Sequence, residues 1–254
     1  MALAPKKTET LEIHALKQGR ATLRLIGRTP FFYNAMSSKA KRTLLIGGGK
    51  KTAAEKKEIK HDPETEFRAS VYRTRTGPTL LAFPAAGVKG AMATAALETP
   101  GVTKTSVQRL IFLPQERISI WGKPFLRMDV VRSADMNKTP DIRSRAFLPR
   151  WCAEIEIAFT MPTLNIGSIV SLLANAGIVV GIGDFRQEKG RGSFGTFHVA
   201  GDDLGEHQAL WDELMAEGRD VQETALATPE MANDETAELY DMLVDERARR
   251  DEGA

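Results

Sequence analysis

Hydrophobic and polar residues alternate along several short stretches of the chain, and a period of two residues is typical of β-strands. The alternation is strict over residues 151–159, which we expect to form a strand with one buried face. Near the N-terminus, Gln18 and Gly19 interrupt the alternation and predict a hairpin or a broken strand. The expected strands are residues 10–16, 21–26, 80–83, 117–121, 125–131, 151–159 and 195–199.

Other stretches have the residue types and spacing of helices. Residues 85–97 are rich in small side chains between Pro84 and Pro100. Residues 165–176 are amphipathic and are followed by Gly177, a common residue at a helix end. Residues 218–235, between the two C-terminal helices, are expected to be a linker. The expected helices are residues 36–45, 52–60, 85–97, 165–176, 206–217 and 236–250.

The order of these elements predicts an α+β fold. The core elements follow the order strand, helix, strand, long loop, strand, helix, strand. This is the order of a ferredoxin-like or RRM-like core. Residues 34–66 are expected to be a helical insertion, and residues 132–150 a basic loop with few apolar side chains. We therefore expect a domain over residues 1–201 and a helical tail over residues 202–254.

A glycine-rich stretch at residues 181–197 (GIGDFRQEKGRGSFGTF) is the most unusual feature of the sequence. An apolar run at residues 176–180 precedes it and residues 195–199 end it, so we expect a strand, a flexible basic loop and a second strand. Glycines allow a backbone to approach a ligand closely. The loop carries three cations among its aromatic residues, which predicts an anionic ligand; these cations are Arg186, Lys189 and Arg191.

Nucleotide-binding motifs do not account for this loop. Residues 190–195 (GRGSFG) fit the pattern G-x-G-x-x-G, but a dinucleotide fold needs a helix next and residues 196–199 predict a strand. A kinase would need further motifs that the remaining chain lacks. Residues 47–52 (GGGKKT) are not a P-loop either, because Leu44 stands where its first glycine belongs.

Charge divides the chain into a basic body and an acidic tail. Residues 202–254 hold 17 acidic and 4 basic residues, which leaves 31 basic and 16 acidic residues in the rest of the chain. Such asymmetry predicts a polyanionic partner for the body, although charge runs can also serve solubility alone. The tail is expected to compete with nucleic acid for the body or to recruit a basic protein.

Composition excludes several classes of site. Cys152 is the single cysteine, so neither a disulfide framework nor a cysteine metal cluster is expected. The four histidines lack the spacing of a metal motif, and we expect no metal and no cofactor. No apolar run has the length of a transmembrane helix, and the N-terminus lacks the pattern of a signal peptide, which predicts a cytoplasmic protein.

Two local motifs resemble the repeat-associated mysterious protein (RAMP) superfamily. Residues 83–92 (FPAAGVKGAM) are similar to its helix start, and residues 181–195 look like its glycine-rich loop before the last strand. The resemblance implies that the loop at residues 132–150 corresponds to the thumb hairpin of CRISPR effector backbone subunits, which stack into helical filaments. The insertion at residues 34–66 would correspond to their finger-like helices. The acidic tail is not part of the family pattern, so a solo, phage-borne relative fits as well.

The main hypothesis is therefore a non-enzymatic protein that binds single-stranded RNA or DNA and assembles side by side along it. Cations would contact phosphates, and Phe185 or Phe194 would stack on a base. The residues expected to bind nucleic acid are Lys39, Lys41, Arg42, Lys89, Arg143, Arg145, Arg150, Phe185, Arg186, Lys189, Arg191 and Phe194.

Two other functions stay open at this point. A RAMP-type RNA endonuclease would need a histidine as general base, and His14 and His198 are the candidates. A structural or assembly protein of a virion would use its charges for packing and solubility only.

Overall fold

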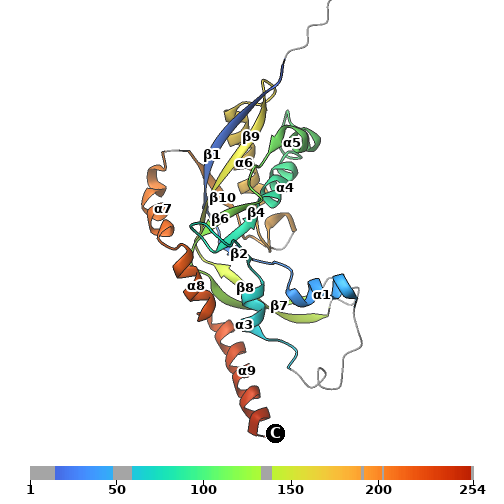
Figure 1. The fold of residues 1–254 in the computed structure, drawn as a ribbon, viewed down its shortest axis with the longest axis vertical. Helices are drawn as coiled ribbons and strands as arrows, with labels where there is room; N and C mark the ends of the chain where they lie inside the picture. The colour runs from blue at the N-terminus through green and yellow to red at the C-terminus, as the bar shows by residue number, and fades with distance from the viewer. Residues whose placement is uncertain (1–14, 48–58, 133–138, 190–191, 202, 253–254) are drawn as a thin grey trace, which may run out of the picture.

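The computed structural model describes residues 15–47, 59–132, 139–189, 192–201 and 203–252. The molecule is elongated: a large sheet with its covering helices forms one half, and a small sheet and the last helix form the other (Figure 1). This mixture of antiparallel sheets and helices confirms the expected α+β class.

The larger sheet has the strand order β10-β1-β9-β6-β4-β3, with every neighbouring pair antiparallel, and a short strand β5 also pairs with β9. Strand β4, and not β1, leads directly into the first covering helix, so the ferredoxin-like order stays a prediction. The strands are β1 (Lys17–Gly27), β3 (Tyr72–Arg73), β4 (Leu81–Pro84), β5 (Ile111–Phe112), β6 (Arg117–Trp121), β9 (Cys152–Met161) and β10 (Phe197–Ala200).

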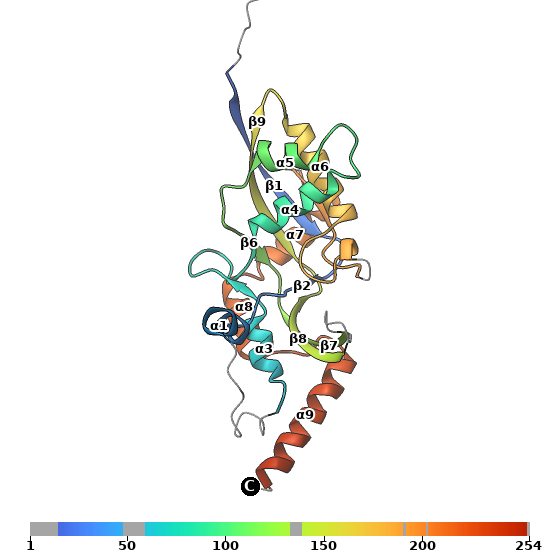
Figure 2. The same cartoon turned by 90° about the vertical axis from the view of Figure 1, so that its right-hand side faces the viewer.

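Three helices cover one face of this sheet, as Figure 2 shows. They are α4 (Ala85–Ala95), α5 (Lys104–Leu110) and α6 (Ile166–Val179). The alanines Ala85, Ala91, Ala93 and Ala95 of α4 are buried, which lets the helix pack closely against α6 and β4. Helix α6 begins where the side chain of Asn165 accepts a hydrogen bond from the backbone N–H of Ser168 at 2.9 Å.

The smaller sheet has the order β2-β8-β7, and one helix of the region expected to be an insertion packs on it. Its strands are β2 (Phe31–Phe32), β7 (Phe125–Arg132) and β8 (Pro140–Leu148). Helix α3 (Pro63–Ala69) packs on β8 through the fully buried side chain of Phe67. Helix α1 (Ser38–Ile46) confirms the helix expected over residues 36–45, whereas most of the one expected over residues 52–60 lies outside the described residues.

Two expectations for the N-terminal strand and α6 are wrong for the same reason. Strand β1 runs unbroken through Gln18 and Gly19, and α6 continues past Gly177. A Cβ atom at Gly19 would lie 2.7 Å from the ring of Phe159, and one at Gly177 would lie 2.3 Å from the carbonyl oxygen of Phe197. Both glycines therefore allow close packing and mark neither a turn nor a helix end. Residues 176–180 are the end of a helix and not a strand.

The segment at residues 132–150 is also not a long loop. Most of it is β8, which pairs with β7 from Arg132↔Pro140 to Phe125↔Phe147. The polar and charged residues in the first half of β8 hide the alternation that would have predicted a strand.

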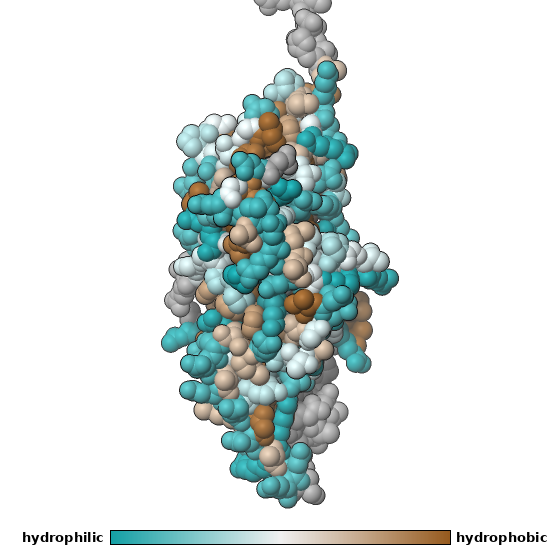
Figure 3. Space-filling view, turned by 90° about the vertical axis from the view of Figure 1, so that its left-hand side faces the viewer, coloured by the Kyte–Doolittle hydropathy of each residue, from teal (hydrophilic) through white to brown (hydrophobic). Residues whose placement is uncertain are grey.

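Helices α7 (Gln208–Met215), α8 (Arg219–Ala227) and α9 (Asp234–Glu252) form the C-terminal arm. As expected, Trp211 and Leu214 of α7 dock on the body, where they pack in a cluster with Ile26 and Cys152. Figure 3 views the molecule from the side on which α7 and α8 lie in Figure 1, and this face is largely hydrophilic with scattered hydrophobic patches. No helix among the described residues is both long enough and apolar enough to cross a membrane.

Helix α8 occupies the segment expected to be a linker, and Gln222 joins it to the body. The Gln222 side chain is fully buried. Its Oε1 atom accepts hydrogen bonds from the backbone N–H groups of Leu80 and Leu81, each at 2.9 Å. Its amide nitrogen donates to the carbonyl oxygens of Ile120 at 2.8 Å and Gly122 at 3.2 Å. One side chain thus completes the hydrogen bonding of two segments of the body.

Replacing Gln222 with alanine is expected to lower the free energy of unfolding by about 3 kcal/mol, because several buried backbone groups lose their partners. Urea unfolding followed by circular dichroism measures this change. Gln208→Ala is the control, since Gln208 is exposed and, among the described residues, its side chain bonds only to Asp212. This change should cost less than about 0.5 kcal/mol. Similar losses for the two variants would show that Gln222 does not hold α8 in place.

Candidate nucleic-acid interface

The glycine-rich loop packs its backbone against the protein itself. The N–H of Asp184 donates to the carbonyl of Phe32 at 3.0 Å, and the N–H of Gly195 donates to the carbonyl of Pro30 at 2.8 Å. Gly183 has a φ of +91°, and a Cβ atom there would lie 2.7 Å from the carbonyl oxygen of Phe32. These glycines let the loop approach β2, and not a ligand as the sequence had indicated.

Arg145 is buried at the centre of this contact, with only 3% of its surface exposed. Its guanidinium donates to Asp184 at 2.6 Å and to Asp129 at 3.1 Å. The same group lies 4.3 Å from the centre of the Phe185 ring. The expectation that Arg145 contacts a phosphate is wrong, because two carboxylates and aromatic rings already enclose it.

The two aromatic residues proposed as base-stacking platforms also pack internally. The rings of Phe185 and Phe194 meet that of Phe32 edge-on, with centroids 5.5 Å and 4.8 Å apart. Phe185 has a φ of +51°, an uncommon conformation for a residue with a side chain, so its position is fixed by this packing. Both rings are half-buried parts of the junction between the loop and the small sheet.

Two of the predicted cations are paired with carboxylates. Arg150 donates two hydrogen bonds to Glu213 of the C-terminal arm, at 2.6 Å and 2.8 Å, and Arg186 lies 3.1 Å from Glu188. The hydrogen bonds between Arg150 and Glu213 raise the pKa of the arginine and lower that of the glutamate. These pairs reduce the positive charge that Arg150 and Arg186 offer to a ligand.

Other predicted cations are available. Lys41 and Arg42 on α1 and Arg143 on β8 are exposed, and Lys89 on α4 is half-buried. The side chain of none of the four has a hydrogen bond or ion pair with another described residue. The remaining predicted cations lie outside what the structure describes: the side chains of Lys39 and Lys189, and the whole of Arg191.

An open groove of about 490 Å³ joins one of these cations to three arginines that the sequence did not single out. We call it the basic groove. It lies where α1, α3, β3 and the start of β6 meet, and no carboxylate is among its lining residues. They are Ala35, Met36, Ser38, Lys41, Thr65, Arg68, Ala69, Val71, Tyr72, Arg73 and Arg117.

Backbone carbonyl groups hold the arginines of the basic groove in place. Arg117 donates to the carbonyl of Arg73, and Arg73 donates to that of Arg68, both at 2.9 Å. Arg68 donates to the carbonyls of Leu226 and Ala227 in α8, at 2.9 Å and 3.1 Å. Carbonyl partners position the guanidinium groups without neutralising them, but Arg68 also lies 3.5 Å from Glu64 and Arg117 lies 3.9 Å from Glu116. Lys41 and Arg73 have no carboxylate partner among the described residues, so the groove keeps a positive charge. The density of arginines in residues 68–75, beside Tyr72, is the sequence signal that could have revealed it.

A second hollow, of about 530 Å³, lies on the other side of Ala35 and Met36, which line both. We call it the polar pocket. Two carboxylates lie in it, and each contacts the same imidazole: His61 Nδ1 is 3.0 Å from Glu66, and His61 Nε2 is 3.1 Å from Asp141. The pKa of Asp141 is lowered mainly by a hydrogen bond from Lys60. The lining residues are Asn34, Ala35, Met36, Ser37, Ala40, His61, Glu66, Ser70, Asp141, Ile142, Arg143, Ser144 and Arg145.

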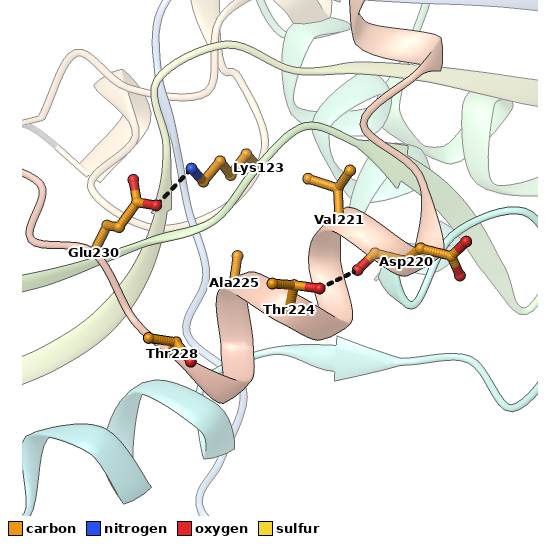
Figure 4. Close-up of a pocket in the computed structure, with 7 residues that line it drawn as sticks. All are labelled: Lys123, Asp220, Val221, Thr224, Ala225, Thr228 and Glu230. Atoms are coloured by element: carbon orange, nitrogen blue, oxygen red, sulfur yellow. Dashed lines mark hydrogen bonds and ion pairs between the residues drawn. The ribbon is translucent and has the colours of Figure 1, made fainter.

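A third hollow, of about 550 Å³, lies beside α8 (Figure 4). Its single cation, Lys123, donates to Glu230 at 2.8 Å, and Asp220 adds a second carboxylate. Thr224 donates its hydroxyl to the carbonyl of Asp220 within the same helix. An excess of acidic groups and internal pairing make this hollow unsuitable for a polyanion.

The structure describes one of the two candidate catalytic histidines, His198. His14 lies outside the described residues. The pKa of His198 is lowered by burial and by the nearby Arg28 and His207. His198 lies on β10, at the opposite edge of the large sheet from β3 and the basic groove. Among the described residues, no group of three or more histidine, cysteine or acidic side chains is arranged to hold a metal ion.

Comparisons with known proteins show a weak structural likeness to solved structures. No family model matches the chain, and no curated protein sequence matches it. A chain in the cryo-EM structure of the Type III-B Cmr-beta bound to cognate target RNA is similar, with a TM-score of 0.39 and 13% sequence identity. The match covers 72% of this chain and 59% of that chain. This likeness is too weak to show a family, and the RAMP resemblance stays a prediction.

Proposed function

We propose that this protein binds single-stranded nucleic acid through the basic groove, without cutting it. The observation that carries the proposal is the groove itself: four cations and no carboxylate line one open hollow. Arg68, Arg73 and Arg117 are held by carbonyl groups, so little side-chain freedom is lost when they meet a phosphate.

Exposed and unpaired cations extend this surface beyond the groove. Arg42 on α1 and Arg75 just after β3 are both exposed and have no partner among the described residues. The guanidinium of Arg117 lies 5.6 Å from the centre of the Tyr72 ring, which helps to keep the arginine in place. A hollow of this size suits one or two nucleotides of a single strand. A duplex could place only its outer phosphates in the groove, because its bases are paired inside the double helix.

Assembly of several copies along the strand is part of the proposal, and α1 supports it. Leu44, Leu45 and Ile46 are consecutive, and 73%, 84% and 66% of their surfaces are exposed. Consecutive exposed apolar residues of this size are uncommon on a monomer and mark association surfaces. Helix α9 carries an acidic stripe, with Glu238, Asp241 and Asp245 exposed and spaced at helical intervals. The exposed cation Arg42 on α1 of one copy is complementary in charge to this stripe in the next.

The test is binding of a fluorescently labelled single-stranded oligonucleotide to nuclease-treated protein over a range of salt concentrations. If three or four phosphates meet the groove, the logarithm of affinity should fall with the logarithm of salt with a slope of about −2 to −3. Fluorescence anisotropy measures the affinity, and light scattering shows whether the oligonucleotide brings several copies together. An affinity that does not change with salt would contradict the proposal.

A further inference from the structure

Ser144 presents a buried hydroxyl group without a partner to the polar pocket. Only 4% of its surface is exposed, and its Oγ atom has no hydrogen-bond partner in the structure. Buried polar groups are nearly always hydrogen-bonded, because an unpaired one costs free energy. An unpaired hydroxyl that lines a hollow therefore indicates a ligand that supplies the missing hydrogen bond.

The backbone of β8 adds further hydrogen-bonding groups to the same wall. Ala146 directs both its backbone groups away from β7: its N–H donates to Ser70 Oγ at 2.9 Å, and its carbonyl accepts from Tyr33 at 3.0 Å. Residues two positions apart in a strand direct their groups to the same side, so Ser144 does the same. Strand β2 pairs with β8 only through Phe31 and Phe32, so no described strand reaches Ser144 on this side.

The polar pocket and the basic groove differ in charge although they share a wall. Ala35 and Met36 line both, but the groove has no carboxylate while the pocket holds Glu66 and Asp141. Each of these carboxylates contacts His61 through one oxygen atom. The other oxygen of each has no partner among the described residues and can accept a hydrogen bond. Arg143 and Arg145 line the same pocket, so its charges are mixed, whereas the basic groove carries cations alone. The free carboxylate oxygens attract a group that donates hydrogen bonds.

We propose that the polar pocket receives the base of a nucleotide whose phosphate lies in the basic groove, and that it selects bases with an exocyclic amino group. The inference rests on the proposed function. Cytosine, adenine and guanine present such an amino group to the carboxylates, and uracil and thymine do not. Ser144 Oγ and the free edge of β8 supply the remaining hydrogen bonds to the base. The protein therefore distinguishes cytosine from uracil while it binds the phosphates of both.

The experiment compares labelled oligocytidine and oligouridine of equal length, because cytosine and uracil differ mainly in the amino group. Oligocytidine should bind about three- to tenfold more tightly, the effect of one or two additional hydrogen bonds. In a Glu66→Gln/Asp141→Asn variant the two oligonucleotides should bind equally. An amide side chain can accept a hydrogen bond from the cytosine amino group or donate one to the uracil carbonyl group. Oligodeoxycytidine should retain the preference over oligodeoxyuridine, since the pocket reads the base.

Ser144→Ala separates recognition from stability. It should weaken oligocytidine binding about threefold or more and leave the salt slope unchanged, because no phosphate contact is lost. The melting temperature should not fall, since the hydroxyl has no partner to lose in the free protein. A lower melting temperature with unchanged affinity would show a structural role and overturn the assignment of Ser144.

The outcomes distinguish this inference from the function on which it rests. Salt-dependent binding with equal affinity for oligocytidine and oligouridine would overturn the base pocket and leave the basic groove supported. A preference for RNA over DNA without a preference for cytosine would show that the pocket reads the sugar, which also overturns it. Absence of salt-dependent binding to either oligonucleotide would remove the proposed function and the pocket together.

Discussion

Replacing both Lys41 and Arg73 with glutamate is expected to weaken binding of a single-stranded oligonucleotide about 100-fold. Both cations line the basic groove from different elements, and each is expected to make a charged hydrogen bond to a phosphate, worth about 1.5 kcal/mol or more. The salt slope should become less steep by about 1.4, since two phosphates are no longer neutralised. Anisotropy titrations at several salt concentrations measure both quantities.

The control is Lys104→Glu/Arg109→Glu on α5. These two cations are exposed and have no partner among the described residues, so the variant has the same change in net charge. Helix α5 lies over the large sheet, away from α1 (Figure 1). The affinity of this control variant for the oligonucleotide should fall only slightly, because the two new charges act only through the overall electrostatic field of the protein. An equal loss in both variants would show that net charge, and not the groove, determines binding.

Arg145→Met is expected to lower the free energy of unfolding by about 3 kcal/mol. Removing one partner of a buried ion pair leaves the other uncompensated. Here Asp184 loses its cation, and Asp129 loses one of two because it keeps Arg127 at 3.0 Å. We place the effect at the lower end of the usual range because 30% of the Asp184 side chain is exposed to water. The contacts of the guanidinium with the rings of Phe32 and Phe185 are lost as well. Urea unfolding measures the change.

Arg143→Met is the matched control for this prediction. Arg143 lies two residues earlier on the same strand, is exposed, and has no partner among the described residues. Its replacement should change stability by less than about 0.5 kcal/mol. Folded Arg145→Met protein should retain its affinity for oligonucleotide. A protein that keeps its stability but loses binding would restore Arg145 as a phosphate ligand and contradict its structural role.

The regular elements could be predicted from the sequence because their signal is local. The alternation at residues 151–159 predicts β9, and the alanines after Pro84 predict α4. Strand β8 was missed because its charged residues include Arg145, whose partners lie on β7 and in the glycine-rich loop. Spacing along one strand carries no information about a carboxylate 39 residues away.

The candidate site was less predictable for the same reason. The glycines and aromatics of residues 181–197 have the residue types of a binding loop, but the structure uses them to join the loop to β2. The basic groove takes Lys41 from one helix and Arg117 from a strand 76 positions later in the chain. Only the fold brings such residues together, so neither periodicity nor motif spacing could have identified them.

The position of Gln222 has a consequence for synthesis of the protein. The backbone of β4 emerges early from the ribosome, yet the partner of its Leu81 N–H group is 141 residues further along the chain. Nascent chains fold from the N-terminus as segments become available. The larger sheet can therefore assemble during translation, but the N–H groups of Leu80 and Leu81 lack their Gln222 partner until α8 has left the exit tunnel. These two donors stay open to other chains until translation is almost complete.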